Sequence, residues 1–126
     1  MDWLVFISGL IALVVVIAHF TMGRKNVLKP MLDASFDDVP KKTMQGVFHN
    51  GSVFTVLSAA VLILVGVGVD FDLGTTLVVR FIALNYSLFA VWWIVIALQS
   101  GIPSPLTKIF QWIFFVLVAV FAWLGA

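Results

Sequence analysis

Four long stretches of mostly apolar residues follow one another along this chain, at residues 3–22, 47–69, 73–98 and 106–125. A helix needs about 20 consecutive apolar residues to cross the hydrocarbon core of a bilayer. Of the 126 residues, 63% are hydrophobic and 10% are charged, whereas soluble domains average about 45–50% and about 25%. A chain this short cannot bury so much apolar surface in a core surrounded by water. The sequence therefore predicts an all-α membrane protein with four transmembrane helices.

The connections between the last three stretches are short, at residues 70–72 and 100–105. Helices joined by short loops lie side by side and antiparallel. Ser104 and Pro105 have the residue types of an N-cap and a first helical position, so we expect them to start the fourth helix. The prediction is an antiparallel four-transmembrane-helix bundle that forms one domain over residues 1–126.

The basic residues indicate how this bundle is oriented. Cytoplasmic ends of membrane helices carry an excess of Lys and Arg. Six of the seven basic residues lie on one predicted side: Arg24, Lys25, Lys29, Lys41, Lys42 and Lys108. The other side has Arg80, close to Asp2, Asp70 and Asp72. We therefore predict a bacterial inner-membrane protein with an N-out/C-out topology and a cytoplasmic loop at residues 23–46.

The long loop at residues 23–46 contains a second helix-start pattern. Asp37 and Asp38 precede Pro40, and acidic residues with a proline are typical of a first helical turn. A helix that begins near Val39 either continues into the second span or is broken at Gly46 or Gly51. We expect the basic residues of the loop to contact lipid headgroups.

Two histidines are the candidate cofactor-binding residues. His19 lies about one turn before the inner end of the first span, and His49 lies near the inner start of the second. Because neighbouring spans are antiparallel, both imidazoles are expected at similar depth, where they have the chemistry to bind a metal or haem iron, relay protons or hold a headgroup. The alternative is that each ring contacts water or a carbonyl without a functional role. Two histidines fall short of the three or four ligands of most metal sites, and the chain has no cysteine. We expect no cofactor, with haem or metal as the alternative.

Further polar residues lie within the third span. Arg80 is about two turns from the outer end, where it can reach the headgroups, pair with a nearby aspartate or form an anion site. Asn85, Tyr86 and Ser87 are consecutive and lie near the middle of the span. Such residues usually form hydrogen bonds between helices, so we favour a packing role over a pore.

Small residues recur at four-residue spacing in the first two spans. Ser8 and Ala12 form one such pair and Thr55 and Ala59 another, and a neighbouring stripe contains Ser58, Leu62 and Gly66. Small side chains at this spacing allow close approach of membrane helices. The pattern predicts a close contact, either within the chain or between subunits.

The segment HFTMGRKNVLKPML, followed by GVFHNGSVF at the second span, resembles a family of small bacterial multi-pass membrane proteins of unassigned function. The matching positions are His19, Gly23, Pro30 and His49. Arg24 is a departure, since an acidic residue is expected there. The resemblance covers the first half of the chain. It singles out these positions but implies no activity.

Several function classes lack the residues they require. The chain has no Ser–His–Asp order, no carboxylate pair within a span and no phosphate-binding glycine loop, so an enzyme is not favoured. No basic and aromatic patch indicates nucleic acid. Small multidrug exporters and fluoride channels have a similar size, but the former depend on a membrane glutamate and this chain has none.

We therefore predict a non-enzymatic accessory or scaffold protein, or a subunit of a larger membrane assembly. Its expected partners are the lipid bilayer and either further copies of itself or other membrane proteins. One alternative is a haem- or metal-binding redox component that uses His19 and His49. The second is a small oligomeric transporter or channel.

Overall fold

The computed structural model describes the backbone of residues 1–126 and every side chain except that of residue 73. Three helices are long and apolar enough to cross a membrane. The first runs without interruption from Trp3 to Asp33 and consists of α1 (Trp3–Ala18), the π-helical η1 (His19–Leu28) and α2 (Lys29–Asp33). The other two are α3 (Asp38–Gly66) and α4 (Thr75–Gln99), the latter preceded by the 3₁₀ turn η2 (Asp72–Gly74).

The expected loop at residues 23–46 is mostly helical, which corrects the sequence-based boundary. The turn is confined to residues 34–37, and α3 continues through Gly46 and Gly51 without a break. Pro40 occupies the first turn of α3, where its missing N–H is not needed. A helix of 31 residues measures about 45 Å, whereas the hydrocarbon core is about 30 Å thick. The first helix is therefore longer than the hydrocarbon core is thick.

The last expected helix, at residues 106–125, is divided in two. A short α5 (Pro105–Lys108) is followed by α6 (Gln111–Gly125), which has 15 residues. Ser104 adopts a left-handed backbone conformation with φ 51° in place of the expected cap geometry, and Ile109 leaves the helical region at φ −106° and ψ 82°. Trp112 Nε1 donates to the carbonyl of Leu106 at 3.0 Å, which stabilises the break. At about 22 Å, α6 is shorter than a typical span.

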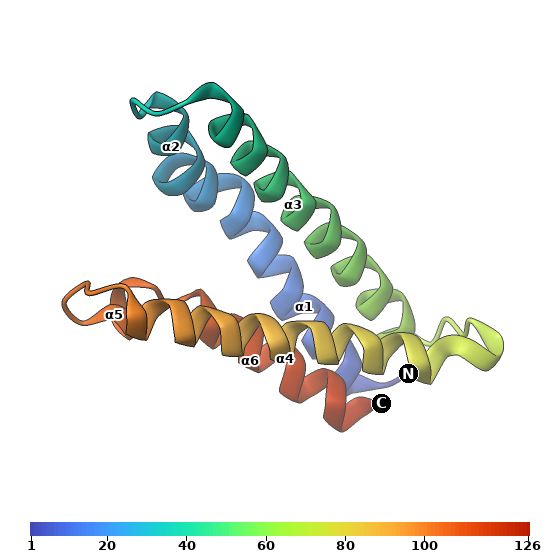
Figure 1. Ribbon diagram of the computed structural model, residues 1–126. Coiled ribbons are helices and arrows are strands. Elements are labelled where there is room, and N and C mark those ends of the chain that lie inside the picture. The colour runs from blue at the N-terminus through green and yellow to red at the C-terminus, as the bar shows by residue number, and fades with distance from the viewer.

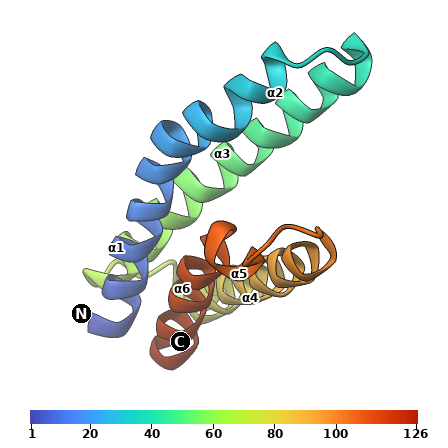
Figure 2. The same ribbon diagram turned by 90° about the vertical axis from the view of Figure 1, so that its left-hand side faces the viewer.

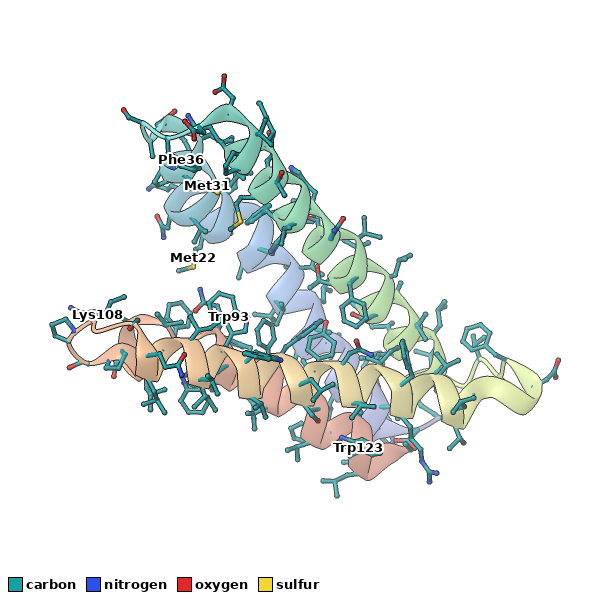
Figure 3. The ribbon with its side chains drawn as sticks, in the orientation of Figure 1. Met22, Met31, Phe36, Trp93, Lys108 and Trp123 are labelled. Atoms are coloured by element: carbon teal, nitrogen blue, oxygen red, sulfur yellow. The ribbon has the colours of Figure 1, made fainter. Side chains whose placement is uncertain are left out.

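The helices form two hairpins that diverge (Figure 1). One hairpin pairs α1 with α3, the other pairs α4 with α6, and α1 packs on α6 near the chain termini. Figure 2 shows the same divergence from a second direction. Both hairpin turns lie on one side of the molecule, while the termini and the connection at residues 67–74 lie on the other. Figure 3 places Met31 and Phe36 at the first turn, Lys108 at the second and Trp123 near the opposite end.

Small residues set the distance between α1 and α3. A Cβ atom built on Gly66 would lie 2.5 Å from Cα of Phe6, and one built on Gly9 would lie 2.7 Å from the backbone nitrogen of Ile63. The predicted stripes are all buried, at Ser8, Ala12, Thr55, Ser58, Ala59 and Leu62. The close contact expected from the sequence therefore lies within the chain, between α1 and α3.

We predict that Gly66→Ala lowers the free energy of unfolding by about 1–3 kcal/mol, because the new methyl group would overlap the backbone of Phe6. The measurement is reversible unfolding in detergent, followed by circular dichroism. The matched control is Gly46→Ala on the same helix, where a Cβ atom meets nothing within 4 Å. Equal stability of the two variants would contradict the packing interpretation.

Candidate functional site

The two histidines meet at one serine hydroxyl. His19 is the first residue of η1, and His49 lies three residues before Ser52 on α3. His19 Nε2 lies 2.7 Å from Ser52 Oγ, and His49 Nδ1 lies 3.3 Å from the same oxygen. The two ring nitrogens are therefore no further apart than the sum of these distances. The antiparallel pairing of the first two helices brings together the two residues that the sequence singled out.

Phe48 fixes the orientation of the His19 ring. The two rings are stacked, with centroids 4.1 Å apart and planes inclined by 17°. Glycines flank this stack on both helices at ordinary contact distance: a Cβ atom on Gly51 would lie 3.6 Å from His19 Cε1, and one on Gly23 would lie 3.6 Å from the Phe48 ring. Gly23, noted in the sequence for its position after His19, thus contacts the aromatic side of the site.

The helix that carries His19 is π-helical for ten residues, from His19 to Leu28. Such helices are rare, are usually one turn long and occur often at functional sites. Pro30 follows directly, at the start of α2. Inside a continuous helix a proline ring collides with the carbonyl four residues earlier and provides no N–H. Widened turns before Pro30 are one way for a helix to continue past it.

The chain His19–Ser52–His49 has the chemistry of a proton path. A serine hydroxyl donates one hydrogen bond and accepts two, and each imidazole can donate or accept according to its tautomer. Ser52 Oγ also lies 3.3 Å from the carbonyl of Phe48, to which it can donate. His19 is half-buried between the helices and His49 is exposed, so the path would lead from the helix interface to the surface.

The fit to a metal or haem is incomplete. Among the described side chains, no group of three or more His, Cys, Asp or Glu comes together, whereas most metal sites use three or four ligands. A haem held from two sides needs both imidazoles aimed at one iron. Here both rings are aimed at the hydroxyl of Ser52, and one face of His19 is covered by Phe48.

Beside the histidines, η1, α2 and α3 line an open groove with a volume of about 600 Å³. One part of its lining is apolar, formed by Phe20, Leu28, Leu32 and Phe48. The other part is polar, formed by Arg24, Lys29, Asp33, Gln45 and His49. The groove therefore joins the exposed histidine to two cations and an apolar wall.

The polar residues of the third span serve different contacts. Tyr86 is fully buried, and its hydroxyl lies 2.8 Å from Ser58 Oγ on α3. Ser87 accepts from Trp123 Nε1 at 3.2 Å, which connects α4 to α6. Asn85 Nδ2 donates to the carbonyl of Phe81 in its own helix. These three consecutive residues therefore make separate contacts, within α4 or with other helices, and do not form one site.

Arg80 lies on the exposed surface of α4. Asp70, one of its expected partners, accepts instead from the hydroxyl of Thr75. An exposed position near the outer end of α4 agrees with an arginine that reaches towards headgroups.

Sequence reasoning missed Ser52 and the groove cations as members of the histidine site. The signal for Ser52 was its spacing of three residues from His49, which places both on one helix face. The sequence signal for the groove cations was weaker. Arg24 and Lys29 line the same wall through the π-helical geometry of η1, which was not predicted from the sequence.

No protein-family model, no curated protein sequence and no solved structure matches this chain. The features that bear on function are the composition of the helices and the contacts of their polar side chains. Those contacts divide into two groups: packing contacts near the chain termini and the histidine site near the first hairpin turn.

We predict that Ser52→Ala changes the ¹⁵N shift of His19 Nε2 and lowers the free energy of unfolding by about 1 kcal/mol, because the half-buried imidazole loses its hydroxyl partner. Histidine-selective NMR in detergent measures the first effect and thermal unfolding the second. The control is Ser100→Ala, since this hydroxyl bonds to the carbonyl of Ala97, far from the histidines in sequence. An unchanged His19 resonance in Ser52→Ala would show that the hydrogen bond does not form.

Proposed function

We propose that this chain is a non-enzymatic, multi-pass component of a bacterial inner membrane, with four crossings and both termini outside. It would act as a scaffold or accessory subunit through its membrane-embedded helices. The observation that carries this proposal is the use of polar side chains: most of those in the apolar parts of the helices bond to one another or to backbone carbonyls, although the buried Oε1 of Gln111 has no partner among the described residues. They hold helices together and leave the apolar faces outward.

Three hydrogen bonds illustrate this use. Ser8 donates to the carbonyl of Val118 at 2.7 Å and joins α1 to α6. Ser58 and Tyr86 join α3 to α4, and Trp123 and Ser87 join α6 to α4. Hydrocarbon provides no hydrogen-bonding partners, so polar groups at this depth must find them within the protein. Side chains bound in this way support packing more than a transport path.

The outward surface favours a membrane environment and further contacts within it. Large apolar side chains are exposed on several helices, for example Leu77 at 71%, Trp92 at 64% and Leu124 at 66%. In water such surface would drive association. In a bilayer it is available to lipid, to a second copy or to another membrane protein.

The fourth crossing and the orientation are supported by position. Although α6 is short, it packs along α4 and on α1, and the residues from Pro105 to Gly125 span 21 positions. Both hairpin turns lie on one side of the molecule (Figure 1). The segments that flank the two turns carry Arg24, Lys25, Lys29, Lys41, Lys42 and Lys108. Such an excess is typical of the cytoplasmic side.

A second candidate function is a histidine-dependent ligand or redox site. The observation in its favour is that the two imidazoles lie close together, each within 3.3 Å of Ser52 Oγ. A bound ligand would have to replace these contacts with Ser52. Visible absorbance and metal analysis of protein purified with added haem or with transition metals test this candidate, with His19→Ala and His49→Ala as controls. Binding lost in both variants would favour it over a purely structural role.

We predict that three single-cysteine variants distinguish four crossings from three. The chain has no cysteine, so each new thiol is the sole target of a membrane-impermeant maleimide. We expect Ala126→Cys to be labelled in spheroplasts. Ser35→Cys and Thr107→Cys should be labelled after permeabilisation alone.

Each other result has a defined meaning. If α6 stays on the inner side, Ala126→Cys will behave like Thr107→Cys. If the orientation is reversed, all three patterns will be exchanged. If carbonate extraction releases the protein from membranes, the membrane proposal itself is wrong.

We also predict that vesicles containing the purified protein keep an imposed proton or potassium gradient as long as protein-free vesicles do. The physical reason is that the hydroxyls of Ser8, Ser58 and Tyr86 are occupied by packing contacts between helices. Fluorescent dyes for pH and membrane potential measure the decay. Protein-dependent decay that is abolished by Tyr86→Phe or His19→Ala would favour the transporter alternative.

A further inference from the structure

The groove beside the histidines is divided into a cationic part and an apolar part. Arg24 and Lys29 lie on the wall formed by η1 and α2, opposite His49 and Gln45 on α3. Phe20 and Phe48 belong to the apolar part. Asp33 adds one negative charge near the hairpin turn. A ligand that satisfies both parts must be anionic at one end and apolar at the other.

The π-helix places the two cations on one wall. Arg24 and Lys29 are five residues apart, and the N–H of Lys29 donates to the carbonyl of Arg24. In an α-helix with 3.6 residues per turn, side chains at this spacing would point about 140° apart. The wider turn, which bonds residues at a spacing of five, allows both to line the same groove. The π-helical geometry thus places both positive charges on one wall of the groove.

The groove lies where the first hairpin changes from apolar to polar sequence. The apolar stretch of the first helix ends near Met22, and the apolar core of α3 begins near Val53. The groove begins at this change, at Phe20 and His49, and continues along the polar part of the hairpin to Asp33 and Gln45. The hairpin extends further to Phe36 (Figure 3). In an inserted protein this is the depth of the phosphate groups, with acyl chains on one side and water on the other.

We propose that this groove binds one anionic phospholipid, with its phosphate between Arg24, Lys29 and His49 and the start of an acyl chain along Phe20 and Phe48. A volume of about 600 Å³ holds a headgroup and part of one chain, and the open side admits a lipid from the bilayer. Guanidinium groups bind phosphate oxygens through two parallel hydrogen bonds, and lysine adds a point charge. Gln45 and Asp33 are placed to accept from hydroxyls of the headgroup. The inference rests on the proposed insertion into a membrane.

A lipid explains features that a soluble anion leaves unexplained. Inorganic phosphate would use the cations but has no need of the apolar wall. A general attraction of basic residues to an anionic membrane would use Lys25 and Lys41 as well, although neither lines the groove. A comparison of the groove cations Arg24 and Lys29 with Lys25 and Lys41 therefore distinguishes specific lipid binding from a general electrostatic attraction to the membrane.

The experiment uses the purified full-length chain in nanodiscs that contain phosphatidylglycerol and phosphatidylcholine in equal amounts. Native mass spectrometry after gentle release counts the lipids retained on each protein. The test variant is R24Q/K29Q, and the matched control is K25Q/K41Q, which removes the same charge from the same hairpin. We expect the wild type and the control to retain phosphatidylglycerol preferentially. The test variant should lose most of this preference, because both cations that line the groove are removed.

A second variant tests the geometry with the charge kept. Arg24→Lys should retain part of the preference, because an ammonium cannot form the paired hydrogen bonds of a guanidinium. Circular dichroism of all variants confirms that they remain helical. Because Arg24 and Lys29 are exposed, their replacement leaves the core unchanged.

Three outcomes would overturn the inference. Equal loss in R24Q/K29Q and K25Q/K41Q would show a diffuse attraction. Displacement of phosphatidylglycerol by millimolar inorganic phosphate would assign the groove to a soluble anion. Equal retention of both lipids by the wild type would show that the groove does not select charge.

Flotation of the protein with vesicles separates this inference from the proposed function. Protein that floats but does not prefer phosphatidylglycerol contradicts the lipid site alone. Protein that does not float contradicts both.

Discussion

The close approach of α1 to α3 at Gly9 and Gly66 is the constraint on which the rest of the first hairpin depends. Apolar side chains gain little by leaving lipid for one another, so membrane helices associate through close packing and hydrogen bonds. Backbone contact at Gly9 and Gly66 also fixes how the two helices are aligned. Along the same pairing, His19 lies ten residues after Gly9 and Ser52 eleven residues before Ile63. The position of the histidine site follows from glycines at the other end of the hairpin.

Regular α-helical geometry ends where this pairing reaches the histidines. Packing near the termini is tight, whereas the segment from His19 to Leu28 forms wide π-helical turns. This geometry accommodates Pro30, leaves Gly23 beside the Phe48 ring and turns Lys29 towards the groove of Arg24. A sequence that formed an ideal α-helix would keep His19 but place the two cations on different faces. The irregular helix is therefore a determinant of the candidate site.

The sequence predicted the apolar stretches, the small-residue contact and the similar depth of His19 and His49, because these follow from hydropathy, periodicity and antiparallel pairing. It left open whether the two rings meet. It also left open whether a helix that begins near Val39 continues into the second span, as α3 does. It did not predict that residues 23–33 are helical, since their polar composition has no apolar periodicity of its own. The break at Ile109 and the divergence of the two hairpins depend on contacts such as that of Trp112 with Leu106, which no local pattern reveals. Asn85, Tyr86 and Ser87 are adjacent in the sequence, but consecutive helical residues point in different directions and contact different neighbours.

The divergence of the hairpins links the packing to the candidate site. The core formed by Val5, Leu62, Tyr86 and Val118 lies towards the termini, and an aromatic group of Phe54, Phe89 and Phe115 adds contacts between the hairpins. Beyond these rings α4 turns away from α3 (Figure 1), so the second hairpin does not cover the groove. If the two hairpins lay side by side along their whole length, α4 and α6 would lie closer to η1 and restrict the approach of a lipid from the bilayer. Tight packing at one end of the molecule and an accessible amphipathic groove at the other thus arise from a single arrangement of the helices.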